Sequence, residues 1–122
     1  MSYKLARDDT RAVIVVKYHG ATSLRDRVAA VNDSIALLRQ SGYRRVLVDI
    51  SAARLSFESP DDESAFAEFI SNNEVLKQCK TAFLAGTDQH SNDFIEILAS
   101  AKHHNLDHFT HIDAAYEWLS KN

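Results

Sequence analysis

Two short apolar runs constrain the fold of this 122-residue chain more than any other feature. Residues 46–50 (VLVDI) and 81–85 (TAFLA) are too short for buried helices, and segments with helical patterning flank both. Strands that are apolar along nearly their whole length are typical of parallel sheets covered by helices. We therefore expect the two runs to lie side by side in the middle of one sheet.

A helix is expected between the N-terminal strands and residue 46. Ser23 can cap it, with Asp26 at the third helical position, and Gly42 stands where a helix ends in a left-handed residue. One apolar stripe recurs at helical spacing: Leu24, Val28, Val31, Ile35 and Leu38. The opposite face is expected in solvent: Arg25, Asp26, Arg27, Asn32, Asp33 and Arg39.

Three further helical segments follow. Ser59-Pro60-Asp61-Asp62 is a strong start signal, and Asn72-Asn73 is expected to end that helix before a further turn at Val75-Leu76. A helix capped by Asp88 or Ser91 is expected next, then a strand over residues 108–112 and a helix capped by Asp113 over residues 114–121. Core positions are expected at Ala65, Phe66, Phe69, Ile70, Phe94, Ile95, Leu98, Ala101, Ala115, Trp118 and Leu119.

The N-terminus is predicted to form a hairpin. Residues 3–6 and 11–18 have strand character, turn residues separate them, and Gly20 closes the second strand. Strands joined by helical crossovers pair in parallel with right-handed connections. The expected fold is a single α/β domain over residues 1–122, with a five-stranded mixed, mainly parallel sheet, an edge hairpin and about four helices.

Composition excludes several classes of function. Fourteen basic against seventeen acidic residues give a net charge of -3, which argues against nucleic acid as a partner. No run approaches the roughly 18 apolar residues of a membrane span, and the N-terminus lacks a signal-peptide pattern, so we expect a cytoplasmic protein. Cys79 is the only cysteine, which leaves no internal disulfide and predicts a buried thiol.

A family resemblance rests on three segments. They are the strand that reaches Asp49, the residues Leu55-Ser56-Phe57 ahead of the helix capped at Ser59, and the closing Ala115-Tyr116-Glu117-Trp118-Leu119. With this order of elements the chain resembles the STAS and SpoIIAA-like family, whose founding members are bacterial antagonists of anti-sigma factors. The resemblance implies a non-catalytic regulatory domain that binds another protein.

The resemblance also implies a phosphorylation site at the start of the second main helix, where Ser59 is the matching residue. Family members usually carry an aspartate, two hydroxyl residues and a glycine at this point, whereas this chain reads Glu58-Ser59-Pro60-Asp61-Asp62. Neighbouring carboxylates would repel a phosphate, which favours a plain helix cap at Ser59.

The best candidate surface lies at the carboxyl ends of the predicted parallel strands, where open α/β sheets place their binding crevices. The alternative is that Asp49 caps a neighbouring backbone and that the acidic cluster only solvates a helix start. The candidate residues for a ligand or partner are Asp49, Ser51, Phe57, Glu58, Ser59, Asp61, Asp62, Thr87 and Asp88.

Enzymatic motifs are absent from the sequence. Asp49, Ser51 and His90 could supply the groups of a hydrolase triad, but no Gly-x-Ser-x-Gly elbow or glycine-rich phosphate loop occurs. The histidines of residues 103–111 lack metal-ligand spacing, so we expect no metal, no cofactor and no enzyme.

Two alternatives to the regulatory domain stay open. One is a carrier of a small apolar or lipid-like ligand, with a cavity lined by Phe57, Phe66 and Phe69. The other is a metal-dependent hydrolase that uses the histidine cluster of residues 103–111. A homodimer is compatible with each of these functions, and no residue pattern requires one.

Overall fold

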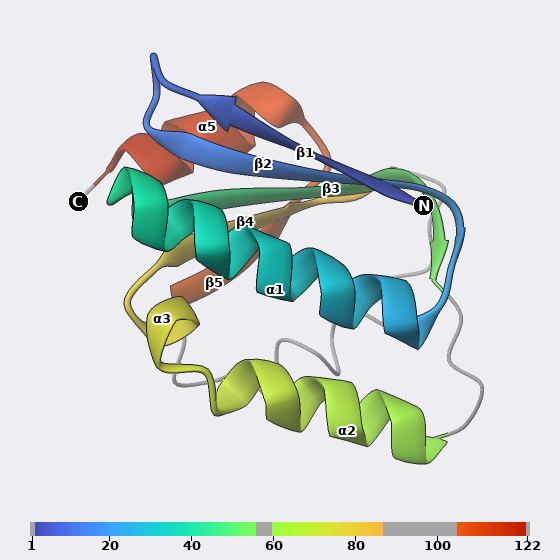
Figure 1. Ribbon diagram of the computed structural model, residues 1–122. Helices are drawn as coiled ribbons and strands as arrows, with labels where there is room; N and C mark the ends of the chain where they lie inside the picture. The colour runs from blue at the N-terminus through green and yellow to red at the C-terminus, as the bar shows by residue number, and fades with distance from the viewer. Residues whose placement is uncertain (1, 56–59, 87–104, 122) are drawn as a thin grey trace.

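The computed structural model describes residues 2–55, 60–86 and 105–121, and these form a five-stranded sheet with helices on both faces (Figure 1). The strands lie in chain order across the sheet, with β1 and β2 antiparallel and all other neighbours parallel. The expected mixed, mainly parallel α/β fold with an edge hairpin is confirmed. The strands are β1 (Tyr3–Asp8), β2 (Val13–Thr22), β3 (Arg45–Leu55), β4 (Lys80–Leu84) and β5 (Asn105–Phe109).

Four helices are described, and they divide between the two faces of the sheet. In Figure 1, α1, α2 and α3 lie on one side of the sheet and α5 lies on the other. The helix expected after Asp88 lies outside the described residues. The described helices are α1 (Leu24–Ser41), α2 (Pro60–Ser71), α3 (Glu74–Lys77) and α5 (Ile112–Ser120).

The two apolar runs pair as expected, in parallel and in the middle of the sheet. Val46 is the partner of Thr81, and Asp49 is the partner of Leu84. Two predicted strand ends are wrong, however, because β2 runs on past Gly20 and β3 runs on past residue 50. The two extensions pair with each other as far as Thr22 and Leu55, so each supplies the backbone partners that the other needs.

Both predicted ends of α1 are confirmed. The Ser23 hydroxyl accepts a hydrogen bond from the backbone N–H of Asp26 at 3.2 Å. At the other end Gly42 has φ 77°, and its N–H donates to the carbonyl of Leu38 at 2.9 Å. Glycine has no Cβ and adopts this left-handed conformation without a steric clash, so the helix can end here.

The predicted solvent face of α1 contains one error, at Arg27. This residue is only 2% exposed. The reason is that α1 contacts the sheet on one side and α2 on the other, so its buried arc is wider than one apolar stripe. Small residues, Ala30 and Ser34, continue the buried line from Arg27 to Leu38.

Smaller corrections concern α2 and the C-terminal segment. Ala65 is exposed, although Phe66 and Ile70 are buried as expected. The last strand begins at Asn105 instead of residue 108, because its first residue pairs with Lys80 at the start of β4. That strand ends at Phe109 instead of residue 112, and helix α5 begins at Ile112, two residues before the predicted start. The N-cap residue is therefore His111 and not the predicted Asp113, and it makes no side-chain cap hydrogen bond.

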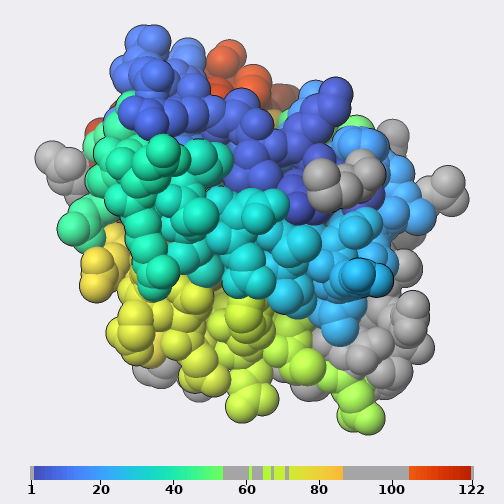
Figure 2. Space-filling model, viewed as in Figure 1, coloured from blue at the N-terminus to red at the C-terminus, as the bar shows by residue number. Residues whose placement is uncertain are grey.

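Two cores result, one on each face of the sheet. The core under α5 is formed by Val13, Leu47, Ala82, Leu84, Ala115 and Leu119. On the other face, α1 and α2 lie beside each other across the surface of the molecule (Figure 2). None of the described helices is long and apolar enough to cross a membrane.

Candidate functional site

The predicted binding surface lies at one end of the sheet. Figure 1 shows that β2, β3 and β4 run towards the end of the molecule at which α1 and α2 begin. The structure describes the side chains of Asp49, Ser51 and Asp61 there. The remaining predicted residues, Phe57, Glu58, Ser59, Thr87 and Asp88, and the side chain of Asp62, lie outside the described part of the chain.

Asp49 and Ser51 form a local hydrogen-bonded unit inside β3. One carboxylate oxygen of Asp49, Oδ1, accepts the backbone N–H of Ser51 at 2.9 Å and the Ser51 hydroxyl at 2.6 Å. The register with β2 shifts at this point, since Lys17 pairs with Asp49 but His19 pairs with Ala52. β3 therefore carries one extra residue here, which is a β-bulge.

The bulge explains why an aspartate stands in the otherwise apolar run of residues 46–50. A bulge takes a backbone N–H out of the ladder, and the Asp49 carboxylate supplies an acceptor for it. Asp49 is half-buried, whereas Ser51 is exposed and its hydroxyl is held in place. Asp49 thus caps a neighbouring backbone N–H, which is one of the two roles that we considered for it. The same carboxylate holds the exposed Ser51 hydroxyl at the surface.

Asp61 is exposed in the first turn of α2. Negative charge at a helix N-terminus is stabilised by the helix dipole. Among the described site residues, hydrogen bonds join Asp49 to Ser51, and Asp61 stands as a separate acidic group.

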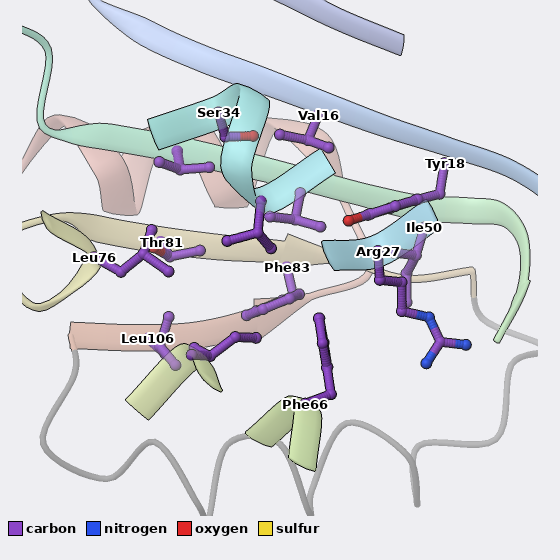
Figure 3. Close-up of a pocket in the computed structure, with 14 residues that line it drawn as sticks. Val16, Tyr18, Arg27, Ser34, Ile50, Phe66, Leu76, Thr81, Phe83 and Leu106 are labelled. Atoms are coloured by element: carbon purple, nitrogen blue, oxygen red, sulfur yellow. The ribbon is translucent and has the colours of Figure 1, made fainter. Parts of the chain in front are cut away.

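A second candidate site is an apolar cavity of about 70 Å³ between the sheet and α1, α2 and α3 (Figure 3). Phe66, which we expected at a pocket, lines it, whereas Phe69 is half-buried beside Phe66 without lining it, and Phe57 lies outside the described residues. Its lining side chains are Val16, Tyr18, Arg27, Val31, Ser34, Val46, Val48, Ile50, Phe66, Ile70, Leu76, Thr81, Phe83 and Leu106.

Arg27 is the one charged side chain among the described residues that line this cavity. Its Nη2 donates to the carbonyl of Thr22 at 2.9 Å, and its guanidinium carbon lies 5.9 Å from the ring centroid of Phe66. Figure 3 shows the side chain extending away from Tyr18 to the level of Phe66. Sequence reasoning missed this residue, and the line of Arg27, Ala30 and Ser34 at helical spacing was the signal that could have found it.

Tyr18 borders the same cavity and is 5% exposed. Burial is the main cause that raises the pKa of its phenol above the usual 10.0, while the Arg27 charge opposes the rise. The interior of this layer therefore keeps Tyr18 neutral next to a cation, because burial disfavours the phenolate.

The histidine cluster is dispersed in the part of the chain that can be described. His108 and His111 are both exposed, and the nearest carboxylate oxygen to the His108 ring, from Asp107, is 3.8 Å from its Nδ1. Within residues 2–55, 60–86 and 105–121 no three metal-ligating side chains come together. His90, His103 and His104 lie outside those residues.

Solved structures with the same arrangement of helices and strands identify the fold. An anti-sigma factor antagonist from Mycobacterium paratuberculosis matches 98% of this chain and 93% of its own, with a TM-score of 0.60 and 17% identity. SpoIIAA in its unphosphorylated form, an anti-sigma factor antagonist, matches 92% of this chain and 93% of its own, with a TM-score of 0.56 and 11% identity. The chain has the SpoIIAA-like fold.

A third structure widens the likeness beyond those antagonists. An uncharacterised protein of the DUF3478 family from Shewanella loihica, described as having a SpoIIAA-like fold, matches 96% of this chain and 91% of its own, with a TM-score of 0.58 and 16% identity. No protein-family model and no curated protein matches the chain. The SpoIIAA-like fold expected from the sequence is thereby confirmed.

Proposed function

We propose that this chain is a non-enzymatic regulatory domain that acts by binding another protein. The observation that carries the proposal is the match, over more than 90% of both chains, to two proteins described as anti-sigma factor antagonists. Such a protein acts on another regulator, and the SpoIIAA-like fold is the scaffold that this chain shares with them. Because a fold hosts many functions, the proposal depends on a surface that can be tested.

The proposed interface is the edge formed by the bulge in β3 and the start of α2. Two features of the described residues support it: the Ser51 hydroxyl is exposed and held by Asp49, and the Asp61 carboxylate is exposed at a helix start. Acidic residues near Asp61 in the sequence add to a negative surface that would complement a basic partner. Phosphorylation of Ser59 stays a prediction, which these carboxylates disfavour.

A charge-reversal pair tests the interface. Asp61→Lys changes the proposed surface, and Glu68→Lys makes the same change at another exposed position of α2. The partner is first identified by crosslinking in the host and is then titrated against both purified variants. We expect Asp61→Lys to weaken binding by about 10-fold or more, because a like charge now meets the basic partner surface, and Glu68→Lys to bind normally. Equal binding by both variants would remove the start of α2 from the interface.

The apolar cavity favours a second candidate, a carrier of a small apolar ligand. Its volume of about 70 Å³ is far below the roughly 300–1,000 Å³ of usual ligand pockets. A cavity of this size would hold a few methyl or methylene groups and no lipid chain. Native mass spectrometry of the freshly purified protein tests the carrier, since a bound ligand of defined mass would favour it over the regulatory domain.

A further inference from the structure

The opposite end of the sheet carries a second polar surface, which the proposed function does not use. The strands β3, β4 and β5 begin there, close to the ends of α1 and α5 and to α3 (Figure 1). A groove of about 490 Å³ opens at this end. We call it the basic groove, and its lining residues are Ala12, Gly42, Tyr43, Arg44, Arg45, Lys77, Gln78, Cys79, Lys80, Asn105 and Lys121.

The basic groove is lined by positive charge, whereas the chain as a whole carries a net negative charge. Among the described residues that line it, five are arginine or lysine and none is acidic, although the whole chain has a net charge of -3. Such a concentration of one sign in a concave site raises the local concentration of ions of the other sign. A multiply charged anion is therefore the kind of ligand that this groove favours.

The sheet register places the basic residues at the centre of the groove. Arg45, Lys80 and Asn105 are partners at the first positions of three neighbouring parallel strands. Like charges that face each other on adjacent strands repel, so the pair Arg45 and Lys80 costs stability unless an anion lies between or above the two groups. The Asn105 amide adds a neutral hydrogen-bond donor to the same row.

Lys80 is held rigidly in this row. Its ammonium donates to the carbonyl of Trp118 and, at 2.9 Å, to that of Lys121, and it lies 4.3 Å from the centroid of the Trp118 ring. Desolvation first, and then the charges of Arg45 and Lys121, lower the pKa of Lys80. Part of its role is thus to cap the end of α5, where carbonyls attract cations.

Helix capping does not explain the other cations. Arg45 is half-buried, and no hydrogen bond or ion pair joins its side chain to any residue that the structure describes. Asp113 and Glu117 line a neighbouring groove beyond Arg45, and Glu117 is paired instead with Lys121 at 3.8 Å. Arg44 donates to the side chain of Gln78 at 3.0 Å, which holds its guanidinium at the groove.

We propose that the basic groove binds a small ligand that carries two or more phosphate groups. Arginine forks match the oxygens of a phosphate, and the groove volume lies within the range of small-molecule sites. Arg45 and Arg44 would supply bidentate hydrogen bonds to the phosphates, and the ammonium groups of Lys80 and Lys121 would supply point charges. The site is independent of the protein interface proposed at the other end of the sheet.

The single tryptophan provides the readout, because its ring lies against Lys80. The purified protein is titrated with tripolyphosphate at low ionic strength, by Trp118 fluorescence and by calorimetry. We expect saturable 1:1 binding that weakens as salt is raised, since counterions compete with the phosphates. No saturable binding by either method would overturn the proposal.

Two charge-neutral variants and one control locate the site. Arg45→Gln and Arg44→Gln each remove one cation from the groove, and Arg25→Gln removes one exposed cation at the other end of α1. We expect each groove variant to bind tripolyphosphate about 10-fold more weakly, and Arg25→Gln to bind like the unmodified protein. Circular dichroism verifies folding, and the exposed Arg44 keeps the test available should Arg45→Gln unfold. An equal loss in all three variants would overturn the proposed site.

Two further probes test the chemistry of the ligand. Citrate carries a similar charge without phosphate, and hexaglutamate imitates an acidic protein segment. Weaker binding of both than of tripolyphosphate is the expected result, because the two arginines favour phosphate geometry. Tighter binding of hexaglutamate would overturn the small-ligand proposal in favour of an acidic partner chain, and equal binding of citrate would overturn the phosphate preference.

Discussion

Among the described residues, the side chains buried between the sheet and α5 are all apolar, whereas the layer under α1, α2 and α3 contains buried polar groups and a cavity. Buried Arg27, Ser34 and Thr81 border about 70 Å³ of empty space in that second layer. Close packing makes a core sensitive to every change in volume, while a cavity leaves room for side chains to adjust. We infer that α5 fixes the sheet and that the α1 layer is the part of the fold that can tolerate change.

Truncation of one large side chain in each layer gives the largest expected difference. Leu119→Ala, under α5, should lower the free energy of unfolding by about 3–5 kcal/mol, because a 1% exposed leucine leaves a new cavity in an apolar core. Ile70→Ala, at the existing cavity, should cost about 2–3 kcal/mol, since its side chain has fewer neighbours to lose. Urea unfolding measures both. A cost for Ile70→Ala at or above that for Leu119→Ala would break the distinction between the layers.

Arg27 gives the next largest effect, and Arg25 on the same helix is its control. Arg27→Met should destabilise the fold by about 1–3 kcal/mol, because the buried carbonyl of Thr22 loses its donor. Arg25→Met, at an exposed position, should change stability by less than about 0.5 kcal/mol. Thermal unfolding of the two variants is the measurement. If they unfold alike, Arg27 does not hold the α1 layer together.

The two layers also differ in how far their sequences predicted them. Under α5, the expected inward residues Ala115 and Leu119 are buried, and the pairing of residues 46–50 with residues 81–85 is confirmed. The spacing of apolar residues was sufficient there because every buried side chain that the structure describes in this layer is apolar. In the α1 layer the same reasoning placed Arg27 in solvent. A charged residue is predicted to be exposed unless another element, here α2, is known to cover it.

The candidate sites were predictable only in part, for physical reasons. Asp49 was singled out because it lies at the carboxyl end of a predicted parallel strand, but the bulge that it stabilises depends on the register with β2, which no local pattern encodes. The basic groove was missed because its cations come from strand starts and helix ends far apart in sequence. Arg45 and Lys80 become neighbours only when β3 and β4 pair.

One methylene added to each layer is a finer test, on two valines of the same strand. Val13 lies in the core under α5 and Val16 lines the cavity, and both are at most 3% exposed. Val13→Ile should destabilise the fold by about 1–2 kcal/mol through overpacking. Val16→Ile should leave stability unchanged or raise it by up to about 1 kcal/mol, because the methylene enters empty space. A destabilised Val16→Ile would mean that the cavity cannot accept the group. Urea unfolding resolves differences of this size.

The smallest expected difference between the layers is in how much stability each loses at alkaline pH through its buried tyrosine. Burial raises the pKa of Tyr18 in the α1 layer, and it also raises the pKa of Tyr116 on α5. A phenol whose pKa is higher in the folded than in the unfolded chain stabilises the fold fully below the unfolded value near 10, and this stabilisation is lost as pH rises above it.

Tyr18 is 5% exposed and Tyr116 is half-buried, so Tyr18 should contribute more of the loss. Tyr18→Phe should therefore retain about 1 kcal/mol more of its neutral-pH stability at pH 11 than the unmodified protein, and Tyr116→Phe should retain less than that. Urea unfolding at pH 8 and pH 11 measures the difference, and an equal gain for both variants would show that the two layers shield their phenols to the same extent.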